Sequence, residues 1–349
     1  MGEIKYCRRQ YQYEIKFYYM QFRAEYTPKP FPVKIRHTDK LLLVGSCFTE
    51  QIGKKLAAHK FDVLENPNGI LFNPMSIAKA VMSYAEDKVY SADELFWYNE
   101  LWASREHHTR FSDPDKMTAL RNINEEQAAA NAFIKKADWL LLTLGSAFVY
   151  EWQDGKAEQY ENVAANCHKI PADNFNRRLT DPQEIISFLE KMIEKLRKVN
   201  PGVKIIFTVS PVRHLREGFI DNNRSKAALI QALHALTNDR DIFYFPAYEL
   251  VIDDLRDYRF FAEDLVHPNY AATNYVWEKF MPAVIDEPAQ QLMKEINELN
   301  AAMAHKPFNP SSDAHKKFLA ANLKKARELG ERYPYLNLAA EYDYFGSHC

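Results

Sequence analysis

The sequence has few cysteines and no long apolar run. Its 349 residues include 4 cysteines, at Cys7, Cys47, Cys167 and Cys349, and no two of them form a CxxC pair. This spacing predicts neither a disulfide framework nor a structural zinc site, and it fits a reducing cytoplasm. No segment approaches the roughly 18 to 20 apolar residues of a membrane span. We therefore expect a soluble protein without a membrane partner.

A strong charge and a secretory leader are also missing. The formal net charge is -2, which gives no overall attraction to nucleic acid or to an anionic membrane. Residues 1–19 lack the continuous apolar segment and the small-residue cleavage site of a signal peptide. Met20 offers an alternative start. We expect a cytoplasmic location and treat residues 1–19 as an extension outside the folded domain.

The apolar residues that are present favour a sizeable core. The chain is 47% apolar and 13% aromatic, which argues against intrinsic disorder. Five short apolar runs predict buried strands, over residues 40–45, 61–66, 138–145, 203–211 and 241–250. Continuous apolar runs are typical of a parallel sheet that is covered on both faces.

Helical patterns lie between these runs. The sequence predicts helices over residues 73–87, 122–137, 180–199 and 222–239. Asp181 followed by Pro182 is a typical helix start, and Asn124 is a candidate cap for the second helix. Alternating strands and helices predict a three-layer α/β domain with a parallel sheet.

Two further regions differ from this pattern. Residues 88–122 are aromatic and polar and read as an insertion, and the Asp-Gly pair within 149–161 predicts a hairpin. From Glu287 onward the chain is charged and helical, with a loop at 305–313. The predicted organisation is an N-terminal extension, an α/β domain and a C-terminal helical appendage, over residues 1–19, 20–286 and 287–349.

The first strand ends in Gly45-Ser46-Cys47. In an open α/β sheet, ligands bind at the carboxyl ends of the strands. The helix that follows directs free N–H groups toward any charge that develops there. Ser46 is therefore a candidate nucleophile. Cys47 is an alternative, since a thiolate at a helix N-terminus is activated. However, the shift of one residue from Ser46 turns its side chain away from the site.

A catalytic serine needs a base, and the best candidate is His267. Asp264 lies three residues before it, close enough for its carboxylate to hold the imidazole in the tautomer that accepts a proton from serine. Pro268 keeps His267 out of a regular helix.

The "GSCF" block near the start and the "DLVHPN" block near the end together resemble the GSCFA-domain family, a branch of the SGNH/GDSL hydrolase superfamily. Further blocks share this similarity, in the order "NPNGILFNP", "TLGSAFVYEW", "CHKIP", "FTVSPVRH", "NNRSKAALIQA" and "YRFFAEDLVHPNYAA". The similarity extends roughly from Met20 to Pro282. Thr49 departs from the family signature, which has alanine at this position.

The resemblance implies a flavodoxin-like three-layer fold with Ser46, Asp264 and His267 as a catalytic triad, and with neither a metal nor an organic cofactor. It also implies an oxyanion hole formed by the N–H of the nucleophile, a glycine and an asparagine. Gly69 suits the glycine role. The third block contains no asparagine, so Ser146, a backbone N–H or Asn73 are the alternatives.

These residues predict a serine esterase that cleaves a small O-acyl ester, with a carbohydrate as the substrate class suggested by analogy. His108 and Arg213 are candidate substrate contacts. One rival is a non-catalytic binding module that recognises an acylated sugar or a protein partner. A second rival is a thiol-dependent acyltransferase that uses Cys47. The sequence does not indicate an oligomeric state.

Overall fold

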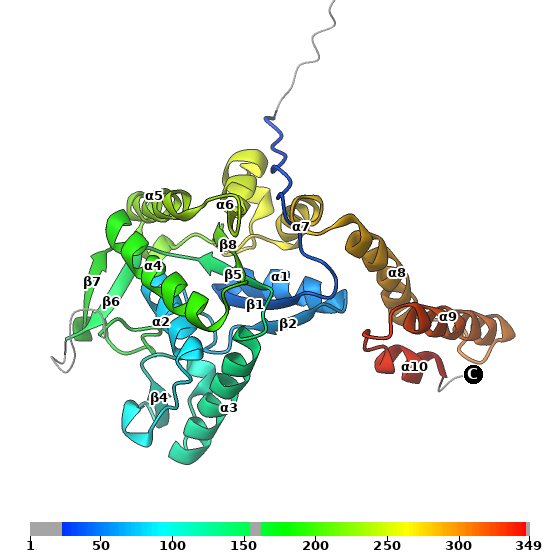
Figure 1. The fold of residues 1–349 in the computed structure, drawn as a ribbon, viewed down its shortest axis with the longest axis horizontal. Coiled ribbons are helices and arrows are strands. Elements are labelled where there is room, and N and C mark those ends of the chain that lie inside the picture. The colour runs from blue at the N-terminus through cyan, green and yellow to red at the C-terminus, as the bar shows by residue number, and fades with distance from the viewer. Residues whose placement is uncertain (1–22, 154–161, 347–349) are drawn as a thin grey trace, which may run out of the picture.

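The computed structural model describes residues 23–153 and 162–346. The predicted extension at residues 1–19 and the turn of the predicted hairpin lie outside these ranges. A parallel five-stranded sheet has the strand order β2-β1-β5-β8-β9 (Figure 1). Numbered along the chain within this sheet, the order is 2-1-3-4-5, which is the flavodoxin-like order. The strands are β1 (Lys40–Gly45), β2 (Asp62–Glu65), β5 (Trp139–Leu144), β8 (Lys204–Val209) and β9 (Ile242–Tyr244).

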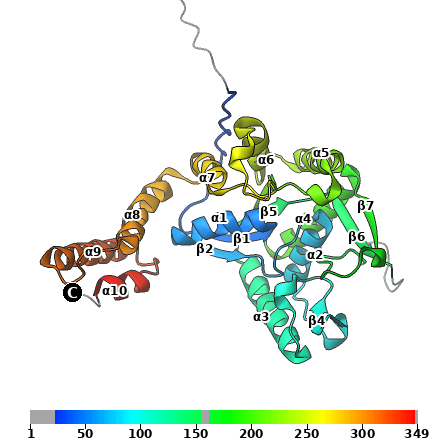
Figure 2. The same ribbon diagram turned by 180° about the vertical axis from the view of Figure 1, so that it is seen from behind.

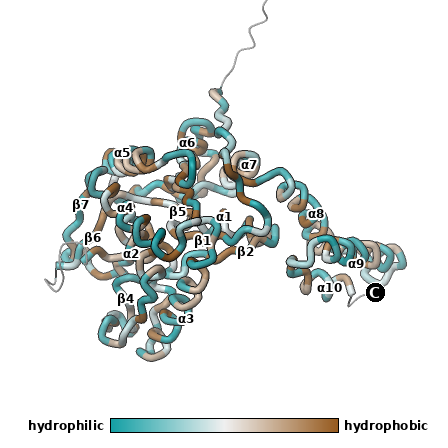
Figure 3. The backbone as a smooth tube through the Cα atoms, viewed as in Figure 1, coloured by the Kyte–Doolittle hydropathy of each residue, from teal (hydrophilic) through white to brown (hydrophobic). Residues whose placement is uncertain are grey.

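Helices cover both faces of this sheet. Successive strand residues point to opposite sides, and because both sides are apolar, both must be buried. Leu42 and Val44 pack with one group of helices, whereas Leu41 and Leu43 pack with the other. The first group is α2 (Pro74–Ala85), α3 (Lys116–Ile134), α4 (Pro182–Val199) and α5 (Phe219–Leu236). The second group includes α1 (Cys47–Ala58), α6 (Ala247–Glu249) with the π-helical turn Leu250–Leu255, and α7 (Tyr270–Val284). Figure 3 shows the apolar strands inside these layers.

The helix starts show which capping signals decide a boundary. Asp181 caps α4 by accepting from the Gln183 N–H, with Pro182 as the first helical residue, as predicted. The predicted start of α3 is wrong. That helix begins after Asp115, whose side chain accepts from the Thr118 N–H. Asn124 lies inside α3 and hydrogen-bonds to the backbone of Tyr90 instead.

Two small antiparallel pairs lie outside the main sheet. In the insertion, β3 (Leu95–Tyr98) pairs with β4 (Leu101–Ser104). The strand β6 (Phe148–Trp152) pairs along its whole length with β7 (Phe175–Leu179), a partner that the hairpin prediction did not include. Glu151 also forms an antiparallel bridge to Val163.

The C-terminal helices form an appendage with an apolar core of its own. It consists of α8 (Glu287–Ala304), α9 (Asp313–Arg332) and α10 (Ala339–Gly346). Figures 1 and 2 show these helices projecting from one side of the α/β domain. The appendage is tied back to that domain by an ion pair between Lys60 Nζ and Glu341 Oε1 at 2.7 Å. A hydrogen bond from Asn300 Nδ2 to the Ala58 carbonyl adds a second contact.

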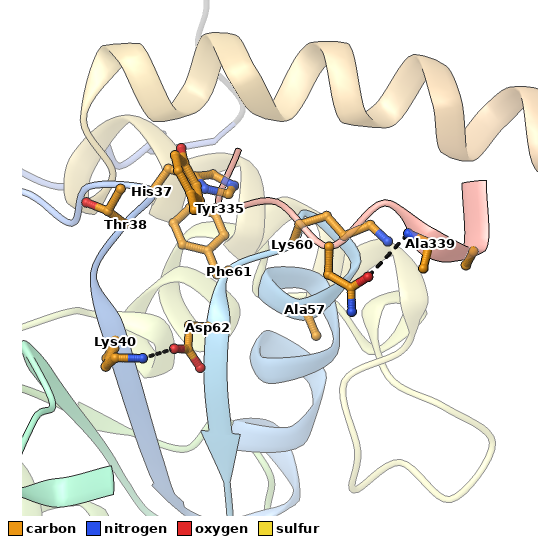
Figure 4. Close-up of a pocket in the computed structure, with 11 residues that line it drawn as sticks. His37, Thr38, Lys40, Ala57, Lys60, Phe61, Asp62, Tyr335 and Ala339 are labelled. Atoms are coloured by element: carbon orange, nitrogen blue, oxygen red, sulfur yellow. Dashed lines mark hydrogen bonds and ion pairs between the residues drawn. The ribbon is translucent and has the colours of Figure 1, made fainter. Parts of the chain in front are cut away.

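A cavity of about 780 Å³ lies where the appendage meets the sheet (Figure 4). Lys40 and Asp62, the first residues of β1 and β2, form an ion pair on its wall. Tyr335 of the appendage faces His37, with ring centroids 5.6 Å apart. This cavity is therefore at the amino ends of the strands, opposite the edge at which ligands bind in open α/β sheets.

Candidate active site

Ser46 lies at the junction of β1 and α1. It caps α1, because its Oγ accepts from the Phe48 N–H at 3.3 Å. Gly45 before it has a φ of 151°, and a Cβ at this position would lie 2.3 Å from the Thr143 carbonyl oxygen of the neighbouring strand. The close approach of β1 and β5 therefore requires glycine at position 45. Ser46 is 1% exposed, so its hydroxyl lies beneath the surface of the carboxyl edge.

Asp264 and His267 form a hydrogen-bonded pair in the loop before α7. Asp264 Oδ2 lies 2.7 Å from His267 Nδ1, and Asp264 Oδ1 accepts from the His267 N–H at 3.0 Å. These hydrogen bonds lower the pKa of Asp264 to about 2. Both side chains are about half exposed, at 48% and 50%. The carboxylate thus stays ionised and can fix the orientation of the ring.

The loop that carries His267 is fastened to the carboxyl edge of the sheet. Arg213, which follows β8, donates its N–H to the Val266 carbonyl at 3.1 Å. His214 lies close enough to His267 for the two rings to interact electrostatically, and its pKa is lowered to about 3 by burial, Lys226 and His267. Among the described residues, however, no hydrogen bond joins Ser46 to His267. The structure brings these two to the same edge of the sheet without a hydrogen bond between them.

Gly69 and His108 lie against each other at this edge. Gly69 has a φ of 79°, and a Cβ there would lie 2.2 Å from His108 Cβ, so a larger residue does not fit. The Gly69 N–H donates to the Asn66 carbonyl at 2.7 Å. His108 is held in place by its own N–H, which donates to Asn68 O at 2.8 Å. Burial lowers the pKa of His108, which favours a neutral ring.

Asn73 and Ser146 both have internal partners. Asn73 caps α2, accepting from the Ser76 N–H at 2.8 Å and donating to Ser76 Oγ at 3.0 Å. Ser146 is 5% exposed. Its Oγ accepts from the Phe148 N–H and contacts Ser225 Oγ at 3.2 Å. The hydrogen bonds of both residues therefore stabilise the loops in this arrangement.

Arg213 packs on aromatic rings. Its guanidinium carbon lies 4.1 Å from the ring centroid of Phe261 and 4.8 Å from that of Tyr258. Its Nη1 is buried without a hydrogen-bond partner. Stacking of this kind fixes the planar group, and the unpartnered nitrogen is a free donor near the His267 loop.

Cys47 is a free cysteine of intermediate exposure. Burial raises the pKa of its thiol, and the nearby Glu50 carboxylate raises it further. A raised pKa reduces the thiolate fraction at neutral pH, and the thiolate is the nucleophilic form. The environment of Cys47 therefore does not favour it as the attacking group.

Three residues at this edge were not singled out from the sequence. Lys226 donates to the Gly145 and Ser210 carbonyls, His214 lies beside Gly145, and Asn66 accepts from the Gly45 N–H at 2.8 Å. Asn66 lies in the "NPNGI" block and Lys226 in the "NNRSKAALIQA" block. Those blocks were the available signal, but they do not reveal which of their residues turn inward.

The sequence profile of the GSCFA family matches residues 40–280, and the profile of the GSCFA domain protein C-terminal domain matches residues 296–348. The first match alone covers more than half of the chain. This chain belongs to the GSCFA family. No curated protein matches the sequence of this GSCFA protein.

Three solved structures are similar to this GSCFA protein at low identity. A carbohydrate esterase of family 3 from Talaromyces cellulolyticus has 12% identity and a TM-score of 0.35, with 74% of this chain and 99% of that chain covered. An acetyl esterase variant crystallised with acetate has 12% identity and a TM-score of 0.34, covering 74% and 100%. An acetyl xylan esterase from the rumen bacterium Butyrivibrio proteoclasticus has 14% identity and a TM-score of 0.33, covering 77% and 66%. TM-scores this low support no inference about activity.

The described residues contain neither a cluster of metal ligands nor a membrane-spanning helix. Across residues 23–153 and 162–346, no group of three or more His, Cys, Asp or Glu side chains is arranged to hold a metal ion. Within the same ranges, no helix is both long enough and apolar enough to cross a lipid bilayer.

Proposed function

We propose that this GSCFA protein is a serine hydrolase that cleaves a small O-acyl ester, with Ser46, His267 and Asp264 as its triad. The observation that carries the proposal is the 2.7 Å hydrogen bond between Asp264 and His267, on a loop anchored to the edge at which Ser46 caps α1. The SGNH resemblance of the ordered sequence blocks supports the same assignment.

The chemistry follows from these positions. Asp264 accepts from His267 Nδ1–H, which leaves Nε2 unprotonated as the base. As Ser46 Oγ bonds to the acyl carbon, its proton passes to Nε2 and the carbonyl electron pair moves onto oxygen. The intermediate collapses, and the departing alcohol takes the proton from His267. Water then repeats the sequence and releases the carboxylic acid and free Ser46.

Stabilisation of the anionic oxygen falls to backbone donors at the start of α1 and to Gly69. In the free protein the Ser46 N–H donates to Thr143 O at 3.2 Å and the Gly69 N–H to Asn66 O. Both donors must therefore exchange a backbone acceptor for the substrate oxygen. The N-terminus of α1 adds a favourable dipole at the same place.

An O-acylated carbohydrate is the substrate that the superfamily resemblance suggests, and a small acyl group such as acetyl fits a nucleophile that lies beneath the surface. A cytoplasmic location remains a prediction from the sequence.

Hydrolysis of 4-nitrophenyl acetate tests the proposal. We expect Ser46→Ala to lower kcat by about a millionfold, since triad serines contribute about that much. Ser312→Ala is the matched control, because Ser312 caps α9 in the appendage by accepting from the His315 N–H. The control should keep full activity. Equal rates for Ser46→Ala and the wild-type protein would contradict the proposal.

A non-catalytic binding module is the second candidate. It is favoured by the burial of Ser46 and by the missing hydrogen bond between Ser46 and His267 among the described residues. Catalytic hydrogen bonds are often long in free enzymes and tighten when substrate binds, so this geometry is compatible with both candidates. Binding of an acetylated oligosaccharide without turnover, unaffected by Ser46→Ala, would favour the module. The thiol rival requires activity that survives Ser46→Ala and is lost in Cys47→Ser.

A further inference from the structure

Lys226 of α5 is a buried lysine at the carboxyl edge. It is 1% exposed. Its Nζ donates to the Gly145 carbonyl at 2.6 Å and to the Ser210 carbonyl at 2.7 Å. These residues directly follow β5 and β8, so a single ammonium group joins the loops after two neighbouring strands, of which β5 lies next to β1.

The charge of Lys226 has no acidic partner. Among the described residues, no carboxylate lies within ion-pair distance of its Nζ. Three titratable groups interact electrostatically with Lys226. They are Cys47 of α1, His214 of the loop after β8 and Tyr248, whose ring centroid lies 5.8 Å from Nζ. Burial lowers the pKa of Lys226 to about 7.

An unpaired buried ammonium is unfavourable for folding. Two carbonyl oxygens satisfy two of its three N–H groups but supply no full negative charge. Its field reaches the start of α1, where it offsets a small part of the rise in the pKa of the Cys47 thiol, and it lowers the pKa of His214. A negative charge formed beside Ser46 would therefore be the missing counter-charge.

We propose that Lys226 is a positioning residue of the reaction centre, which fixes the Gly145 and Ser210 loops and stabilises, through its charge, the anionic oxygen formed during attack by Ser46. This inference rests on the proposed function. No bond to Lys226 forms or breaks, and its protons stay on Nζ throughout the cycle. The role is separable from that of Asp264, which acts on the imidazole.

The test measures kcat/KM for 4-nitrophenyl acetate between pH 6 and 9. Lys226→Met keeps the length of the side chain and removes its charge and its donors. Lys226→Gln retains an uncharged donor. Lys54→Met, at an exposed position of α1, is the control. At pH 6 we expect Lys226→Met to lose about 100-fold, as for a lost oxyanion donor, and Lys226→Gln to recover only a small part.

The pH dependence distinguishes charge from simple packing. Lys226 is protonated below its pKa, so its contribution is complete at pH 6 and is lost as pH rises through about 7. The ratio of wild-type to Lys226→Met kcat/KM should therefore fall at least tenfold between pH 6 and 9, with Lys54→Met matching the wild-type protein throughout.

Two results would overturn the proposal. One is equal kcat/KM for the wild-type protein and Lys226→Met. The other is a loss that is constant across the pH range and follows a lower melting temperature, since that would indicate a purely structural role. Ser46→Ala in the same assay separates the two proposals: if it is inactive while Lys226→Met is unchanged, only the role of Lys226 fails. If Ser46→Ala retains activity, the proposed function itself fails.

Discussion

The two edges of the parallel sheet differ in whether their charged side chains have partners of opposite charge. At the amino edge, a cavity of about 780 Å³ is flanked by matched ion pairs, Lys40 with Asp62 and Lys60 with Glu341. At the carboxyl edge, Lys226 is buried with no acid beside it and Ser46 lies beneath the surface. Balanced charges stabilise an interface between parts of a protein. An unpaired buried charge can stabilise an opposite charge that forms during a reaction, which is why we place the proposed chemistry at the carboxyl edge.

The largest expected effect that tests this contrast is on catalysis at the carboxyl edge. His267→Ala should lower kcat about a millionfold, and Asp264→Asn about ten-thousandfold, because the carboxylate only orients the ring. Both side chains are half exposed, so the variants should fold normally. Steady-state hydrolysis of 4-nitrophenyl acetate gives the rates. Full activity in His267→Ala would show that the carboxyl edge is not the active site.

The second effect concerns the strand end that positions Ser46. Gly45→Ala should lower the free energy of unfolding by about 3 kcal/mol, because the new methyl group would overlap Thr143 O of β5. Gly202→Ala is the control, since a Cβ there meets no atom closer than 4.0 Å. Urea denaturation measures both. A Gly45→Ala protein as stable as Gly202→Ala would show that β1 and β5 can separate at this point.

The third effect is a pH dependence of stability. The pKa of Lys226 is about 7 in the folded protein and 10.5 by reference. Between these values the unfolded chain binds more protons, so the free energy of unfolding rises with pH. From pH 7 to 9, Lys226 should contribute a rise of about 2 kcal/mol. Subtracting the same measurement on Lys226→Met removes other titrations. A difference that does not change with pH would mean that Lys226 keeps an ordinary pKa.

The smallest effect is expected at the amino edge. Glu341→Gln should weaken docking of the appendage by about 1 to 2 kcal/mol, since it removes the buried charge that pairs with Lys60. The rate of 4-nitrophenyl acetate hydrolysis should stay within twofold. Glu298→Gln, which removes an exposed pair with Lys325, should change neither. Thermal unfolding and the activity assay check both variants. A large loss of activity in Glu341→Gln would show that the two edges are coupled.

The apolar runs predicted all five strands of the sheet, and the Asp181–Pro182 signal marked the start of α4. The run 241–250 was predicted too long, since its strand covers only Ile242–Tyr244 and helix begins at Ala247. The prediction of the helix start failed for α3, because Asp115 and not Asn124 is the cap. Both residues are good caps, but Asp115 bonds to the Thr118 N–H whereas Asn124 bonds to the backbone of Tyr90 from inside the helix. Local propensity cannot resolve such a choice.

The candidate site was predictable only in part for a similar reason. The spacing of Asp264 and His267 indicated their hydrogen bond, since three residues of loop bring the groups together. The burial of Lys226 could not be inferred, because a lysine in a helical pattern usually faces solvent. Asn73 illustrates the reverse case. Asn followed by Pro is a helix-start signal, so the capping role of Asn73 could be read from the sequence. In the structure its side chain accepts from the Ser76 N–H.

The contact between Gly69 and His108 has a consequence for how this fold can diversify. The insertion reaches the carboxyl edge through backbone hydrogen bonds, through the tight Gly69–His108 contact and through Arg110, which pairs with Glu50 and donates to the Asn66 carbonyl. None of the five strands depends on the length of that segment. Exchanging it between relatives would therefore change the surface next to Gly69 and leave the five strands as they are, so that specificity can change through a single surface segment.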